Sequence, residues 1–233
     1  MLWKCVKYII PKKMDRIRLF IDELSTEEST PELTNVYSPD IPQSEICREN
    51  LYNYLQRTKS NNTKVMLIGE APSYHGCRLS GIAFTCEENF TVDIIPQIMG
   101  KGLGYKIFSD GKPEKELSAS IVWPKLKDWY NLHGSVPLLW NICPFHPHKQ
   151  GDMMSNRTPR KKEIERGIKY FRELVDIFDI QYVGCIGKKS FNTIESLNFH
   201  IACKYLRHPS CGGKAEFIDN INDYMNYYYI DFQ

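Results

Sequence analysis

One stretch of the chain, residues 65–85, constrains the fold more than any other. It opens with an apolar run that Gly69 and Pro72 end, which predicts a short buried strand leading into a loop. In open α/β sheets, ligands bind beyond the carboxyl ends of the strands. This loop carries a carboxylate at Glu70, several small residues and an aromatic ring at Phe84. We therefore expect it to form a pocket for a flat, polar ligand.

Strand and helix patterns alternate along the rest of the chain. Apolar runs predict strands at residues 65–68, 136–142, 181–186 and 201–206. Helices are predicted at residues 15–24, 44–59, 92–99, 113–132 with a kink at Pro124, 158–178, 188–197 and in the C-terminal segment to 233, with irregular chain at residues 25–42 and 100–112. This order is typical of an α/β fold, here a single domain with a central four-stranded parallel sheet flanked by helices and right-handed crossovers. Residues 1–60 are expected to form an N-terminal extension with a helix packing on the core, and residues 61–233 the α/β domain.

The composition excludes some classes of protein. The 233 residues suffice for one large domain, and a net charge of +2 does not by itself indicate a nucleic-acid partner. No segment approaches the ~18 consecutive apolar residues of a membrane span, and lysines interrupt the apolar N-terminal residues, so no signal peptide is predicted. We expect an intracellular protein with reduced thiols. Its eight cysteines include no Cys-x-x-Cys pair, so neither a metal site nor another cofactor is expected.

Polar side chains follow three of the predicted strands. Glu70, Asn141 and His208 stand at or just beyond the ends of three apolar runs. Because the carboxyl ends of parallel strands meet at one edge, we expect these three residues and Phe84 to converge. Each also has a simpler interpretation: a surface acid, a turn former, a buried histidine and a packed aromatic ring.

Together these motifs resemble the uracil-DNA glycosylase superfamily. The family's first motif, a glycine, an acid or amide, any residue and proline, stands here as residues 69–72, and residues 81–85 follow at the family's spacing with its base-stacking phenylalanine at Phe84. The family's asparagine at the end of an apolar strand is similar to Asn141, and its His-Pro-Ser motif stands at residues 208–210. The resemblance covers residues 65–214 and implies that the chain hydrolyses the bond between uracil, or a related deaminated base, and deoxyribose in DNA.

The resemblance implies a role for each matched residue. Glu70 and His208 would be catalytic: the carboxylate would orient water and stabilise the cationic sugar, and the imidazole would donate to the base O2, where negative charge gathers. The base would contact Ala71, Ser73, Phe84 and Asn141. The DNA backbone would contact Pro72, Arg78, Arg207, Pro209, Ser210 and Lys214, with further cations at Arg157, Arg160, Lys161, Lys188 and Lys189. The partner would be DNA containing uracil or another damaged base, bound by a monomer with no membrane involved.

The chain departs from the family pattern at three places. Ala71 stands where the most selective branch has an aspartate, and Ser73 stands where that branch has a tyrosine that excludes the methyl group of thymine. Residues 211–214 contain no apolar side chain to fill the gap that a flipped base leaves. Selection against 5-substituted pyrimidines is therefore left open.

Two other functions remain open on the sequence alone. One is a non-catalytic member of the same fold that binds a nucleobase or DNA and retains Glu70 and His208 only for recognition. The other is a metal-dependent hydrolase that uses His75, Cys143, His146 and His148.

Overall fold

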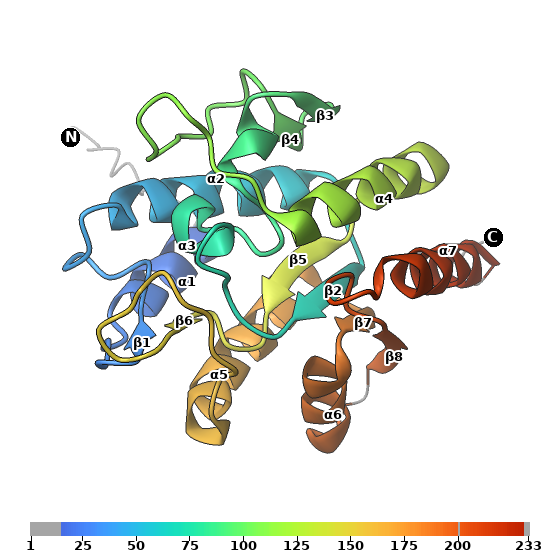
Figure 1. The fold of residues 1–233 in the computed structure, drawn as a ribbon. Coiled ribbons are helices and arrows are strands. Elements are labelled where there is room, and N and C mark those ends of the chain that lie inside the picture. Colours follow the sequence, from blue (N-terminus) through green and yellow to red (C-terminus); the bar gives the residue numbers. More distant parts are fainter. Residues whose placement is uncertain (1–14, 200, 231–233) are drawn as a thin grey trace, which may run out of the picture.

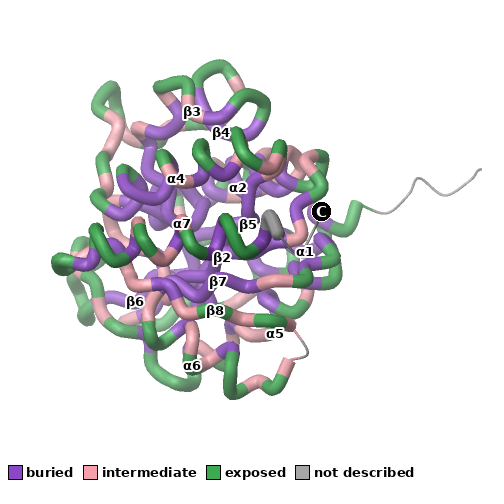
Figure 2. The backbone as a smooth tube through the Cα atoms, turned by 90° about the vertical axis from the view of Figure 1, so that its right-hand side faces the viewer, coloured by how far each residue is buried: buried purple, intermediate pink, exposed green. Residues whose placement is uncertain are grey.

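The core of the molecule is a four-stranded parallel sheet, as the sequence predicts. The computed structural model describes residues 15–199 and 201–230; the rest of the N-terminal extension and the end of the C-terminal segment lie outside the described residues. The strands are β2 (Val65–Gly69), β5 (Leu138–Asn141), β7 (Tyr182–Ile186) and β8 (Ala202–Leu206), in the order β5-β2-β7-β8. Every residue of β2 is buried, which explains why the central strand is a continuous apolar run. Figure 2 shows this buried centre under an exposed outer layer.

Helices cover both sides of the sheet (Figure 1). On one side lie α4 (Leu117–His133) and α7 (Lys214–Ile230), and on the other lie α5 (Lys161–Phe178) and α6 (Lys188–Ser196). The N-terminal helices α1 (Arg16–Ser25) and α2 (Ser44–Ser60) pack on each other. They belong to the same hydrophobic core as the sheet, because Phe20 and Tyr54 are fully buried in it. No helix among the described residues is long and apolar enough to cross a membrane.

Residues 25–42 are largely irregular, as predicted, but part of this segment is buried and pairs with another strand. They contain β1 (Leu33–Thr34), which pairs antiparallel with β6 (His146–Pro147) in the loop after β5. Residues 33–38 are all buried, and the Tyr37 hydroxyl donates to the Gly81 carbonyl over 2.9 Å. This part of the extension therefore packs directly against loops that follow the central strands.

The prediction of a helix at residues 92–99 is wrong. The chain forms a hairpin of β3 (Asp93–Ile95) and β4 (Met99–Gly100) after the short α3 (Cys77–Ser80) and the 3-10 helix η1 (Glu87–Phe90). Gln97 adopts a left-handed φ of 66°, and the Ile98 amide donates back to the Ile95 carbonyl over 3.2 Å. A tight turn around Pro96 therefore replaces the helix, and the β-branched residues before it favour a strand.

Two predicted helices begin later than their sequence signals suggest. α4 begins at Leu117 rather than near Pro113, because the buried Glu87 carboxylate accepts the backbone N–H groups of Phe108, Ser109 and Glu114. α5 begins at Lys161 rather than at Thr158, because the Glu163 carboxylate accepts the Arg160 amide over 2.6 Å. Arg160 is therefore the N-cap residue of this helix. Pro124 lies inside α4, which continues to His133.

Candidate active site

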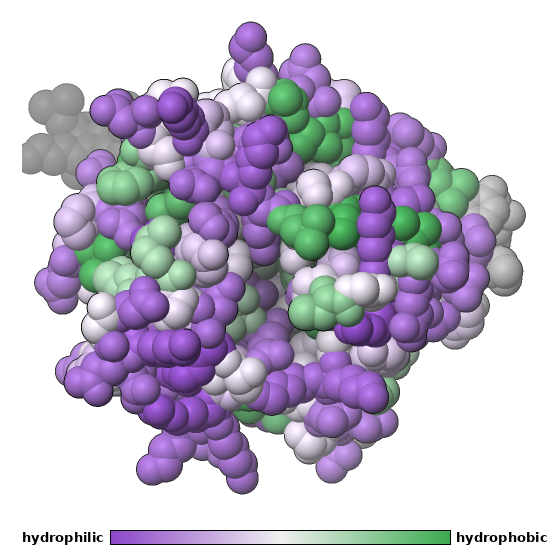
Figure 3. Space-filling view, viewed as in Figure 1, coloured by the Kyte–Doolittle hydropathy of each residue, from purple (hydrophilic) through white to green (hydrophobic). Residues whose placement is uncertain are grey.

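The loops at the carboxyl edge of the sheet enclose a cavity of about 730 Å³. Figure 3 shows the face of the molecule that is hollowed near its centre. Of the base- and DNA-contacting residues that the resemblance implies, this cavity is lined by Glu70, Ala71, Pro72, Ser73, Phe84, Asn141, His208 and Ser210, together with the cation Arg157. Residues more than 130 positions apart in the chain thus meet at one place because β2, β5 and β8 end at the same edge.

Gly69, the last residue of β2, sets how closely the ring and the amide of the site approach each other. Its register partner in the sheet is Asn141. A Cβ atom at Gly69 would collide with the Phe84 ring and lie 2.7 Å from the Asn141 Oδ1 atom. Phe84 itself has a left-handed φ of 52°, a strained conformation for a bulky residue that is typical of functional sites. The ring and the amide are therefore packed over the backbone of the central strand.

Asn141 is almost fully buried and keeps most of its hydrogen-bonding capacity. Its Nδ2 donates to the Cys77 Sγ atom over 3.8 Å, and Cys77 also lines the cavity. Oδ1 and the second Nδ2 hydrogen have no partner within the part of the chain that the structure describes. The amide can thus offer one acceptor and one donor side by side to a ligand in the cavity.

His208 is held as a neutral imidazole with a defined proton. The backbone N–H of Ser210 donates to Nδ1 over 3.2 Å, and the Ser210 Oγ lies 2.8 Å from the same nitrogen. A backbone N–H can only donate, so Nδ1 is the acceptor and the ring proton is on Nε2. Burial lowers the pKa of His208, and the neighbouring Arg207 charge adds to this effect. The ring lies 6.2 Å from the Phe84 ring, with Nε2–H unengaged among the described residues.

Glu70 stands at the mouth of the cavity beside a cation. Its side chain is 34% exposed, and its Oε1 lies 3.6 Å from the Lys189 Nζ at the start of α6. The carbonyl of Glu70 accepts the Cys143 amide over 3.0 Å, which fixes the loop after β2 to the loop after β5. The carboxylate is therefore attached to rigid backbone but remains accessible to water.

The opposite wall of the cavity contains residues that sequence reasoning missed. The Glu116 Oε1 accepts the Ser73 hydroxyl over 3.0 Å, while its Oε2 is buried without a partner among the described residues. Burial raises the pKa of Glu116. Asn156 accepts the Tyr74 amide over 3.0 Å and lines the same wall. Nothing in the sequence distinguishes Glu116 from the nearby Glu114, since its position depends on tertiary packing alone.

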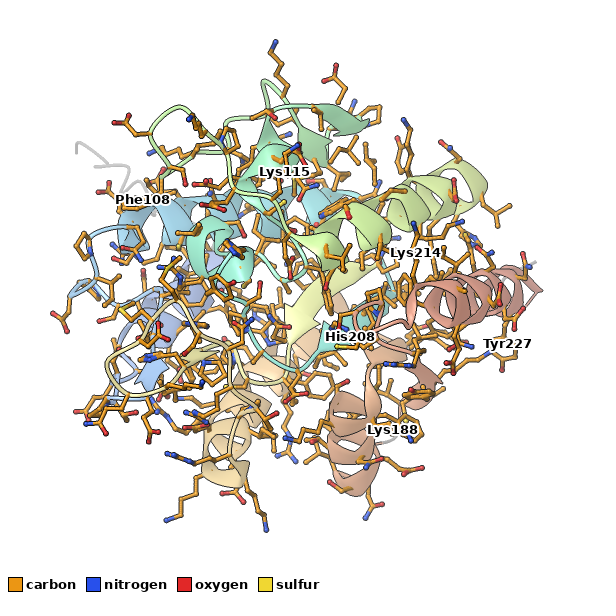
Figure 4. The ribbon with its side chains drawn as sticks, in the orientation of Figure 1. Phe108, Lys115, Lys188, His208, Lys214 and Tyr227 are labelled. Carbon is orange, nitrogen blue, oxygen red and sulfur yellow. The ribbon has the colours of Figure 1, made fainter. Side chains whose placement is uncertain are left out.

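The predicted DNA-contacting residues are in different environments. Arg78 is only 8% exposed and donates to the Tyr74 carbonyl over 3.0 Å, so it does not suit a phosphate contact. Arg207 is half-buried and lies 3.6 Å from Glu216, and Pro209 is buried beside it. Lys188 and Lys214 are exposed, and Figure 4 shows them with Lys115 around His208. Arg157 is engaged with Glu163 at 2.8 Å and Arg160 with Glu32 at 2.7 Å, which leaves Lys161, 3.9 Å from Glu165, as the freer cation there.

The residues of the metal-hydrolase alternative are engaged in hydrogen bonds. The two ring nitrogens of His146 lie 3.0 Å from the Pro72 carbonyl and 3.1 Å from the Met153 carbonyl. His148 contacts Thr34 and the Lys149 carbonyl, and His75 contacts Glu114. Within residues 15–199 and 201–230, no three His, Cys, Asp or Glu side chains are grouped as a metal ion would require. These histidines are thus held by hydrogen bonds within the fold.

The fold and the cavity place the chain among α/β proteins that hold a ligand beyond the carboxyl ends of a parallel sheet. A family model described as the uracil DNA glycosylase superfamily matches residues 56–228. The chain therefore belongs to the uracil DNA glycosylase superfamily, whose members are in general DNA glycosylase hydrolases of DNA repair. A search of curated proteins finds no match to the chain.

Proposed function

We propose that this protein removes uracil, or a closely related deaminated base, from DNA and leaves an abasic site. The observation that carries the proposal is the fixed tautomer of His208, because Nε2–H is a preset donor inside the cavity. When the bond between N1 of the base and C1′ of the sugar breaks, negative charge gathers on the base oxygens. A donor aimed at that charge stabilises the transition state more than the ground state.

The other residues of the cavity supply recognition and water. Asn141 offers an acceptor to the N3–H group of uracil and a donor to its O4 atom, a pattern that cytosine reverses. Phe84 supplies an apolar face for the extruded ring, since the target nucleotide has to leave the base stack. Glu70 orients the water that adds its hydroxide to C1′, and the base leaves with the other proton.

The basic residues around the cavity suit a nucleic-acid backbone. In this proposal Lys188, Lys189, Arg207 and Lys214 contact phosphates, while Pro72, Pro209 and Ser210 press on the backbone beside the target nucleotide. Arg78 is left out because it is buried. In this proposal the protein acts on DNA as a monomer, wherever the genome is held, and the residues named above carry out the reaction without a cofactor.

The proposal is tested by base release from labelled oligonucleotides that contain one uracil, either single-stranded or opposite guanine or adenine. EDTA is present, and alkaline cleavage reports the abasic product. We expect release by the unaltered protein and a loss of about 10²-fold or more in Glu70→Ala with DNA binding retained. Binding without release on every substrate would instead favour a recognition module, and neither binding nor release would contradict both functions.

A further inference from the structure

The side chain of Leu117 is largely exposed, so packing in the core does not explain an apolar residue at this position. It is the first residue of α4, it lines the cavity, and it is 63% exposed, the largest value among the large hydrophobic residues of the described chain. Isolated exposed leucines are common on protein surfaces. This leucine differs because it stands at the rim of the site that receives the base.

The element that presents Leu117 is rigid and tied to the site. Ser118 and Ala119, the next two residues of α4, are buried. One turn further along, the Trp123 Nε1 donates over 3.1 Å to the Thr85 hydroxyl, next to Phe84 in the chain. The exposed side chain and the ring that would receive the base are therefore held in a fixed relation.

The loop after β8, whose Ser210 and Cys211 also line the cavity, carries no large apolar side chain in its described residues 207–213. It exposes Cys211 and Gly212, both small, before α7 begins at Lys214. Lys115, two residues before Leu117, is also exposed and lies on the same face as Lys214 (Figure 4). An apolar side chain thus stands at a rim that also carries exposed lysines, of which Lys115 lies 2.6 Å from Glu88.

We propose that Leu117 enters the DNA base stack at the position that the extruded nucleotide vacates, and so holds the target base in the cavity. This role rests on the proposed function. Extruding a base costs stacking and pairing energy, and an apolar side chain in the gap restores contact with the neighbouring bases. Leu117 is in this sense a positioning residue, because it acts on the DNA stack and not on the reacting atoms.

The test compares kcat/KM for Leu117→Ala on uracil opposite adenine, opposite guanine and in a single strand. We expect a loss of about tenfold or more opposite adenine, a smaller loss opposite guanine and less than about twofold in the single strand, where no stack has to be opened. Leu117→Met keeps the apolar bulk and should retain most duplex activity. Leu132→Ala, at the far end of the same helix and 44% exposed, is the matched control.

A second readout follows the base stack directly. A 2-aminopurine placed beside the uracil brightens when it loses its stacking partner, and Leu117→Ala should weaken this signal on duplex DNA without weakening phosphate binding. Equal losses on single and double strands, or no loss on duplexes, would overturn the role of Leu117 and leave the proposed function intact. Absence of uracil release by the unaltered protein, even from single strands, would overturn both.

Discussion

Two histidines in the loops beyond the sheet, His208 and His146, have opposite hydrogen-bonding environments. His208 receives a backbone N–H on Nδ1 and keeps Nε2–H for the cavity. His146 is fully buried, and both of its nitrogens face carbonyl oxygens, of Pro72 and Met153. Burial lowers the pKa of both rings. Their hydrogen-bond partners therefore separate them: in the proposed function the His208 ring donates to the base, whereas the His146 ring joins two loops.

The His146 environment has a consequence for its protonation. A neutral imidazole has one N–H group and can donate to only one of two carbonyl oxygens, whereas an imidazolium ion donates to both. The hydrogen bonds to Pro72 and Met153 favour the proton, but burial, His148 and Arg78 oppose it, and the net direction of the pKa is downward. At neutral pH this ring therefore satisfies one carbonyl at a time.

The largest effect should come from His208→Ala. Removing the Nε2–H donor should lower kcat for uracil release by about 10²–10³-fold, with the midpoint of thermal unfolding nearly unchanged because the hydrogen bonds of the ring are to the neighbouring Ser210. Base release and circular dichroism measure the two quantities. The matched control is His75→Ala, another histidine that lines the cavity but pairs with Glu114 near the surface. A similar loss of kcat in both variants would contradict the distinction between them.

His146→Ala should show the reverse balance. The carbonyls of Pro72 and Met153 lose the one N–H donor that they share, and a buried ring is deleted, so we expect the free energy of unfolding to fall by about 2–4 kcal/mol. Urea denaturation measures this change, and kcat should fall much less than in His208→Ala. If stability did not change while uracil release disappeared, His146 would belong to the catalytic machinery after all.

Glu116, on the wall of the cavity that the sequence did not predict, is another side chain whose pKa burial shifts. Its pKa is raised, so the folded protein holds this proton more tightly than the unfolded chain, and stability falls as pH rises from the ordinary glutamate range through the raised pKa. Glu116→Gln keeps a neutral side chain at every pH. We expect the variant to gain stability relative to the unaltered protein as the pH rises through the raised pKa of Glu116. Urea unfolding at several pH values tests this, and a difference independent of pH would contradict it.

The smallest effect should come from Ser210→Ala. The hydroxyl donates to Nδ1 and so favours the neutral ring, and its loss should raise the pKa of His208 toward the ordinary value. Because only the neutral ring accepts on Nδ1, the acid limb of the pH–rate profile should move to higher pH. The rate above that limb should change by only about two- to threefold. A profile that does not shift would mean that the hydroxyl is not bonded to Nδ1.

The sequence predicted the sheet and one wall of the cavity well. Apolar runs of strand length identify β2, β5, β7 and β8, and the rule for parallel strands then brings Glu70, Asn141 and His208 to the same edge. The rest depends on contacts between distant residues. The room for Glu116 comes from Gly76, where a Cβ would lie 2.7 Å from the carboxylate oxygen, and no local pattern records that relation. Arg78 was expected to be an exposed cation but is buried against Tyr74.

The pairing of β1 with β6 means that the boundary of sequence similarity is not a boundary of folding. The matched region begins at residue 56, yet Leu33 and Thr34 lie beside Pro147 and His146. Glu32 adds two further contacts, since its carbonyl accepts the His148 amide over 3.0 Å and the Arg157 side chain over 2.6 Å. A fragment cut at the start of the matched region would lose the strand against which its pocket loop is laid. The segment before the matched region thus helps to determine the conformation of the loop after β5.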